Sequence, residues 1–132
     1  MRVMLDTTVC IHIIRQRPPS VLERFGAFAV GDIGLSAITL AELEYGANNS
    51  RDPKRNREAL QRFTAALEIA AFDRDATETY GRIRTTLERK GQPIGPMDLL
   101  IAAHALSLGV RLVTSNEDEF RRVPGLRVEN WL

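Results

Sequence analysis

Short apolar runs alternate along the chain with longer segments whose apolar residues recur at helical spacing. The apolar runs predict strands at residues 2–5, 32–36, 68–72, 110–114 and 126–131. Helical spacing and turn residues predict a first helix that is capped by Thr7 or Thr8 and runs to Pro18 and Pro19. Further helices are predicted at residues 20–25, 38–47, 53–67, 73–90, 97–106 and 117–122. This order predicts an α/β fold, with a mainly parallel sheet covered on both faces.

The segment at residues 97–106 differs from the other predicted helices, because it is apolar nearly all round. Such a helix is buried in the interior of a protein. A loop at residues 91–96, with two glycines and two prolines, leads into it, and Gly109 is placed to end it.

The length of 132 residues predicts one domain, spanning residues 1–132. The chain has no apolar run long enough to cross a bilayer, and Asp6 interrupts the start, so we expect neither a membrane span nor a signal peptide. The one cysteine, Cys10, lies in an apolar run and is expected to be a buried thiol in the cytoplasm.

The net charge of +1 does not by itself indicate a nucleic-acid-binding protein. The positive charge is nearly all arginine, since Lys54 and Lys90 are the only lysines. Arginine presents a planar fork of donors that matches phosphate oxygens. A genome rich in arginine codons explains the same composition equally well.

Acidic residues occur where predicted strands end or helices begin. Asp6 ends the first strand, Glu42 lies in the helix after the second, and Asp98 begins the buried helix. A further polar segment, residues 114–119, follows the fourth strand. Ligands of parallel sheets bind beyond the carboxyl ends of the strands, so these groups are candidates for one site.

Gathered carboxylates repel one another and need a cation to offset their charge. Oxygen ligands without histidine or thiol partners suit Mg²⁺ or Mn²⁺ better than Zn²⁺. Such an ion activates water for attack on a phosphodiester, and two ions about 4 Å apart would divide that work.

Each acidic residue also has a structural interpretation. Asp6 could simply cap the following helix, and Asp98 could only complement a helix dipole. Glu42 competes with Glu44, since helical periodicity does not decide which of them points inward. His104 is more typical of a hydrogen-bonded core histidine than of a catalyst.

Four segments come in the order seen in PIN-domain proteins, and the chain resembles the VapC toxins of bacterial toxin–antitoxin systems. The segments are residues 4–7, 39–46, 95–105 and 112–120. The resemblance implies a three-layer α/β/α sandwich and a magnesium-dependent endoribonuclease that cleaves tRNA or rRNA.

The resemblance also assigns site residues. Asp6 and Asp98 match the principal metal-binding aspartates, and Glu42 matches the helix glutamate, so these three are the predicted catalytic residues. For a fourth ligand Asn116 and Glu119 compete, and we favour Glu119. Thr8 stands where the family usually has asparagine. Predicted pocket and substrate contacts are Thr7, Thr114, Asn116 and Arg55, the last from the basic stretch at residues 51–57.

A free ribonuclease would poison its own cell, and the resemblance implies a VapB-type antitoxin partner, a homodimer, and DNA contact only through the antitoxin. Residues 9–14 and 60–67 are candidate partner surfaces, although both could equally be core.

Two other phosphate-related folds fit poorly. A phospho-acceptor domain needs a lysine at a late strand end, and a dehalogenase-type phosphatase needs a second acid where Thr8 stands. A non-catalytic PIN-like module that binds protein or RNA is the remaining alternative.

Overall fold

The strand β1 (Val3–Leu5) lies at the centre of a five-stranded sheet, between β2 (Ile33–Ser36) and β4 (Arg111–Val113). The edge strands are β3 (Glu68–Ala70) and β5 (Val128–Glu129), so the strand order is β3-β2-β1-β4-β5. Every neighbouring pair is parallel. The structure, a computed structural model, describes residues 1–132.

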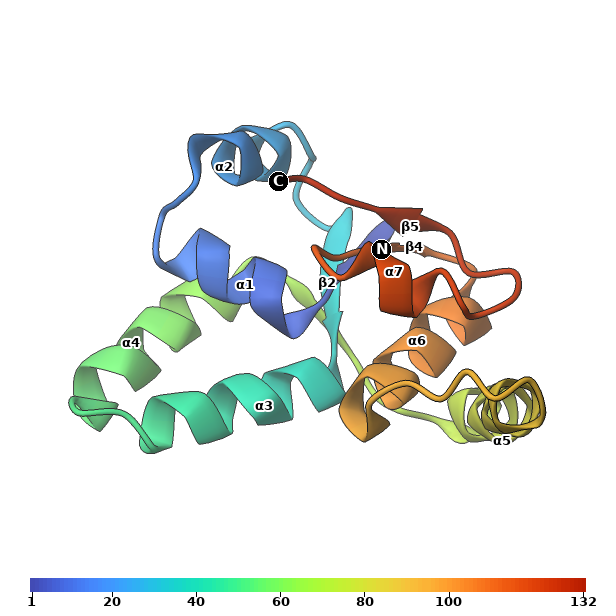
Figure 1. Ribbon diagram of the computed structural model, residues 1–132. Coiled ribbons are helices and arrows are strands. Elements are labelled where there is room, and N and C mark those ends of the chain that lie inside the picture. The colour runs from blue at the N-terminus through green and yellow to red at the C-terminus, as the bar shows by residue number, and fades with distance from the viewer.

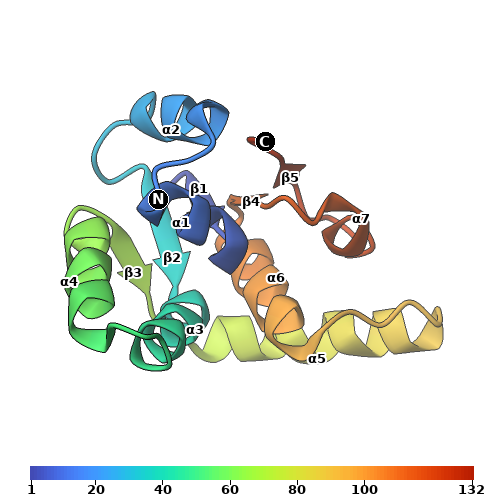
Figure 2. The ribbon, with the colours of Figure 1, turned by 60° about the vertical axis from the view of Figure 1, so that its left-hand side comes forward.

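Seven helices connect and cover the strands (Figure 1). They are α1 (Thr7–Ile14), α2 (Pro19–Gly26), α3 (Ala37–Asn48), α4 (Pro53–Thr64), α5 (Arg74–Arg89), α6 (Pro96–Leu108) and α7 (Glu117–Phe120). Helices α1 and α4 lie on one side of β2 and α6 in Figure 1, and α5 lies on the other, and Figure 2 turns the same arrangement by 60°.

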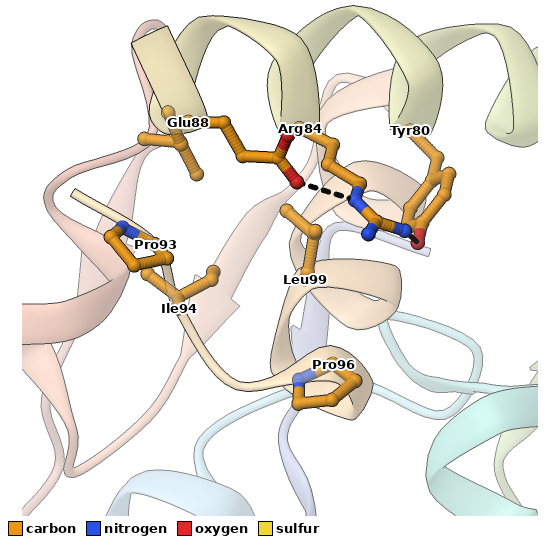
Figure 3. A pocket seen from close by; sticks show the side chains of 8 residues that line it. Tyr80, Arg84, Glu88, Pro93, Ile94, Pro96 and Leu99 are labelled. Carbon is orange, nitrogen blue, oxygen red and sulfur yellow. Dashed lines mark hydrogen bonds and ion pairs between the residues drawn. The ribbon is translucent and has the colours of Figure 1, made fainter. Parts of the chain in front are cut away.

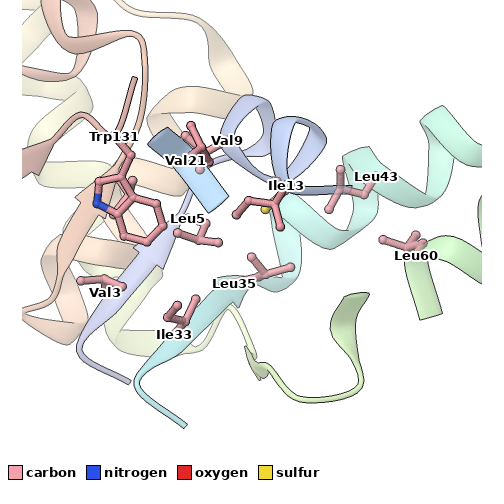
Figure 4. Close-up of a cluster of buried hydrophobic side chains, with 12 residues drawn as sticks. Val3, Leu5, Val9, Ile13, Val21, Ile33, Leu35, Leu43, Leu60 and Trp131 are labelled. Atoms are coloured by element: carbon pink, nitrogen blue, oxygen red, sulfur yellow. The ribbon is translucent and has the colours of Figure 1, made fainter. Parts of the chain in front are cut away.

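The alternation of side chains along β1 explains the two helical layers. Val3 and Leu5 point into one hydrophobic cluster, whereas Met4 points into another on the opposite face of the sheet. The first cluster takes Val9 and Ile13 from α1, together with residues of α2, α3 and α4 (Figure 4). The second takes its residues mainly from α5 and α6. This arrangement confirms the predicted three-layer α/β/α sandwich.

The apolar segment before Gly109 is the buried helix α6, as predicted. Ile101, Ala102 and Ala103 are fully buried on it. Gly109 ends the helix in the left-handed conformation, with φ of 67°, which an L side chain adopts only with strain. Gly34 is needed for a different reason, which is the close approach of two strands. A Cβ at this position would lie 2.8 Å from the backbone oxygen of Glu68 in the neighbouring strand.

Some predicted boundaries are wrong. Asp6, and neither Thr7 nor Thr8, caps α1, because its side chain accepts a hydrogen bond from the amide of Val9. The third and fifth strands are shorter than predicted and end at Ala70 and Glu129, because pairing with β2 and β4 stops there.

The two candidate partner surfaces lie partly in the core. Val9, Cys10 and Ile13 are buried in the first, and Leu60 is 3% exposed in the second. The buried Cys10 is a free thiol, as predicted. No helix has both the length and the apolar character needed to cross a membrane.

Candidate active site

Strand register brings Asp6 and Thr114 together. Leu5 of β1 pairs with Val113 of β4, so the next residue of each strand lies side by side beyond the carboxyl end of the sheet. The Thr114 hydroxyl donates a hydrogen bond to Asp6 Oδ2, while Oδ1 accepts from the Val9 amide at 2.9 Å. Asp6 therefore caps α1 with one oxygen and faces β4 with the other, and it is only 4% exposed.

Glu42 reaches the same region from α3. Its Oε1 accepts a hydrogen bond of 2.5 Å from the hydroxyl of Thr7, the residue after Asp6. Glu44 lies two positions further along α3 and is exposed. Because residues two apart on a helix point in different directions, only Glu42 of this pair faces Asp6.

Asp98 and Glu119 meet around Gly95, the residue that precedes α6. The Gly95 amide donates to Glu119 Oε1 at 2.6 Å. A Cβ on Gly95 would lie 3.6 Å from that oxygen and 3.8 Å from Asp98 Oδ2. The other oxygen of Glu119 accepts from the side-chain amide of Asn116 at 2.6 Å. Thus Asn116 orients Glu119, and the two candidates for the fourth ligand interact directly.

The electrostatics of the site follow from this gathering of carboxylates. Burial, with the charges of Glu119, Asp6 and Glu42 added, raises the pKa of Asp98 to about 6. The pKa of Asp6 is also raised, mainly by burial, although its hydrogen bonds from Thr114 and Val9 act in the opposite direction. None of the four carboxylates takes part in an ion pair with a basic side chain. The site therefore carries uncompensated negative charge.

The donor set fits a hard divalent cation, since it offers carboxylate and hydroxyl oxygens without thiols. No three acidic, histidine or cysteine side chains stand close enough to form a ready-made metal cage. Instead, Asp6, Glu42 and Glu119 each turn toward a hydrogen-bond donor of the protein. Because gathered carboxylates repel one another, a cation among them would favour their closer approach.

Two further residues that the sequence singled out, Thr8 and Arg55, are exposed, and Arg55 lies on α4. His104 is a buried histidine, as predicted, and its Nδ1 lies 2.7 Å from Ser36 Oγ. Gly95, whose amide donates to Glu119, was not predicted as a site residue, although a glycine directly before a buried helix was an available signal.

The PIN domain family matches residues 3–126, so fold and sequence together define a PIN-domain protein. The tRNA(fMet)-specific endonuclease VapC of Shigella flexneri is 44% identical over 131 residues, which cover 99% of this chain and 98% of that protein.

Two solved complexes contain chains of nearly the same structure. One is VapBC2 of Rickettsia felis bound to a DNA fragment from its promoter, with a TM-score of 0.94, 42% identity and complete coverage of both chains. The other is DNA-bound VapBC of Salmonella typhimurium, with a TM-score of 0.95, 43% identity and coverage of 100% of this chain and 99% of that chain. The chain belongs to the PIN-domain family and, within it, to the VapC ribonucleases. The predicted class of enzyme, an endoribonuclease, is thereby confirmed.

Proposed function

We propose that this protein is a magnesium-dependent endoribonuclease toxin that cleaves tRNA in the cytoplasm, with Asp6, Glu42 and Asp98 as its catalytic residues. The observation that carries the proposal is the convergence of Asp6, Glu42, Asp98 and Glu119 beyond the carboxyl end of the sheet, where burial and the other carboxylates also raise the pKa of Asp98. These acids come from four separate parts of the chain, and no basic side chain offsets them. A fold stabilised only by ordinary packing has no need of that arrangement.

Asp6 and Asp98 would hold the ion, assisted by Glu42 and by Glu119. A Mg²⁺ ion bound there would lower the pKa of a bound water and offset negative charge on a phosphodiester. The chain contributes orientation: Thr114 and the Val9 amide hold Asp6, and Thr7 holds Glu42. Side chains that are already held lose little conformational freedom when substrate arrives.

The Shigella relative is named for tRNA(fMet), and its identity extends over nearly the whole chain. Initiator tRNA is therefore the first candidate substrate in our proposal, ahead of rRNA. The VapBC complexes support a VapB-type antitoxin as the partner of this chain, with promoter DNA contacted through the antitoxin. The homodimer implied by the resemblance stays a prediction.

The test is cleavage of defined RNAs by the purified, antitoxin-free protein. We expect initiator tRNA to be cut in Mg²⁺, to survive in EDTA, and to be cut again when Mg²⁺ or Mn²⁺ is restored. Sequencing of RNA ends from cells that express the protein identifies the cut position. Full activity in chelator would refute the metal mechanism, and intact RNA under every condition would favour the non-catalytic binding module.

We expect cleavage to fall by at least about 100-fold in each of three variants, Asp6→Asn, Glu42→Gln and Asp98→Asn, because each removes a ligand of the catalytic ion. Glu44→Gln is the matched control, because Glu44 lies on the same helix as Glu42 but is exposed. A folded Asp6→Asn variant that cuts at the parent rate would refute the assignment.

A further inference from the structure

Four arginines surround a hollow of about 430 Å³ between the end of α1 and the helix α4. Arg15 follows α1, Arg51 precedes α4, and Arg55 and Arg62 lie on α4. Arg55 and Arg62 are seven residues apart, which is two helical turns or about 10 Å along the axis, so they share one face. Asp52 is the only acidic residue in the lining. We name this feature, defined by the four arginines, the arginine hollow.

The guanidinium groups of the arginine hollow have no partner within the protein. None of them forms an ion pair. Arg84 on α5 provides a contrast, because its guanidinium pairs with Glu88 at 2.9 Å and also donates to the hydroxyl of Tyr80 at 2.9 Å (Figure 3). Like charges that are gathered without counter-charges repel one another, so the arginine hollow is prepared for an anion.

The arginine hollow adjoins a groove that includes one residue of the candidate active site. This neighbouring groove of about 260 Å³ has Glu42 in its lining. Arg15, Ile14 and Asn56 line both the groove and the hollow. One path therefore leads from the carboxylate that contacts Thr7, past Arg15, to the arginines of α4.

We propose that the arginine hollow binds the phosphate backbone of the RNA substrate beside the cleavage site, and this inference rests on the proposed function. The guanidinium fork matches phosphate oxygens, and two turns of α4 give room for more than one phosphate. A nucleic acid explains both ends of the path, because one polymer presents phosphates to the arginines and a phosphodiester to the carboxylates. An acidic peptide would account for the arginines alone.

The first measurement is RNA binding without cleavage. Fluorescently labelled bacterial tRNA is titrated in EDTA with protein that carries Asp98→Asn, and anisotropy is followed at several KCl concentrations. Adding R51Q, R55Q and R62Q together is expected to raise Kd at least tenfold at low salt. Loss of three phosphate contacts also makes the slope of log K against log salt shallower by about 2.

The matched control removes three arginines from α5, which lies on the opposite side of the molecule from α4 in Figure 1. R74Q, R82Q and R89Q change net charge by the same amount at exposed positions. We expect this control to keep the parent salt slope. If both triple variants unfold at the same Tm as the parent protein, neither has lost its fold.

The second measurement is cleavage with the natural carboxylates in place. The variant that combines R51Q, R55Q and R62Q is expected to have a higher KM for tRNA with little change in kcat. Equal Kd values and slopes in the two triple variants would overturn the inference, as would failure of the parent to bind tRNA. Weaker binding of the antitoxin with unchanged tRNA binding would also overturn it and would assign the arginine hollow to the peptide.

The outcomes separate this inference from the proposed function. Arginine-dependent binding of tRNA that is never cut in Mg²⁺ would keep the arginine hollow as an RNA-binding surface and refute the magnesium-dependent cleavage of tRNA that we propose as the function. Cleavage of tRNA at the parent rate by the variant with R51Q, R55Q and R62Q would support the proposed function and overturn the inference.

Discussion

Replacing Asp98 by asparagine should stabilise the metal-free protein, although Asp98 is a predicted catalytic residue. The charged form of Asp98 is disfavoured in the folded state, because the side chain is partly buried and faces Glu119, Asp6 and Glu42. Asparagine has nearly the same shape and no charge. The substitution therefore removes repulsion without leaving a cavity.

The magnitude follows from the pKa. A rise from 3.8 to about 6 makes the folded protein bind more protons than the unfolded chain between those values. Stability must then fall as pH rises through that window, and the full cost is present above it. The shift corresponds to about 3 kcal/mol. Solvent exposure and the lost attraction to the dipole of α6 reduce the expected net gain to about 1–2 kcal/mol at pH 8.

The assay is reversible urea unfolding in EDTA at pH 8 and pH 5, followed by circular dichroism. Asp98→Asn is expected to raise the free energy of unfolding at pH 8 and to raise it less at pH 5, where the parent carboxyl is largely protonated. Asp75→Asn, at an exposed position on α5, is the control and should change stability by less than about 0.5 kcal/mol. An Asp98→Asn variant less stable than the parent at pH 8 would refute the repulsion argument.

Three further substitutions test the supporting contacts. Thr114→Val removes the hydroxyl that donates to Asp6, and we expect tRNA cleavage to fall about tenfold with the fold intact; an unchanged rate would contradict the positioning role. Gly34→Ala places a Cβ 2.8 Å from the backbone of β3, and urea unfolding should report a loss of about 1–3 kcal/mol, whereas unchanged stability would refute the clash. Ser36→Ala removes the cap of α3 and the partner of His104, with a similar loss expected in the same assay; a neutral result would contradict that contact.

The order of strands and helices was predictable because each element carries its own local signal. Apolar runs mark the strands, and Gly109 marks the end of α6. The third and fifth strands were predicted too long, because where pairing ends depends on the neighbouring strand. The cap of α1 was misassigned, since Asp6, Thr7 and Thr8 are all good capping residues.

The site was predictable as a set of acids and less so as a geometry. Residue order indicated Asp6 and Asp98, and the resemblance to the VapC toxins chose Glu42 over Glu44. Helical periodicity alone could not make that choice, because only tertiary structure brings Glu42 near the hydroxyl of Thr7. Apolar positions in residues 9–14 are too continuous to reveal which of them face the core. The basic stretch at residues 51–57, with Arg55, was predicted as a substrate contact. The arginine hollow as a whole was not predictable, because Arg15 and Arg62 are distant in sequence and only tertiary structure brings them together.

The proposed mechanism requires above all that these carboxylates bind a divalent ion in the absence of RNA. Calorimetric titration of Mn²⁺ into the purified, antitoxin-free protein measures it. We predict saturable binding to the parent and to Glu44→Gln, and binding weakened at least tenfold in Asp6→Asn and in Asp98→Asn. Equal affinity of all four proteins for Mn²⁺, or no binding by the parent, would contradict the central claim.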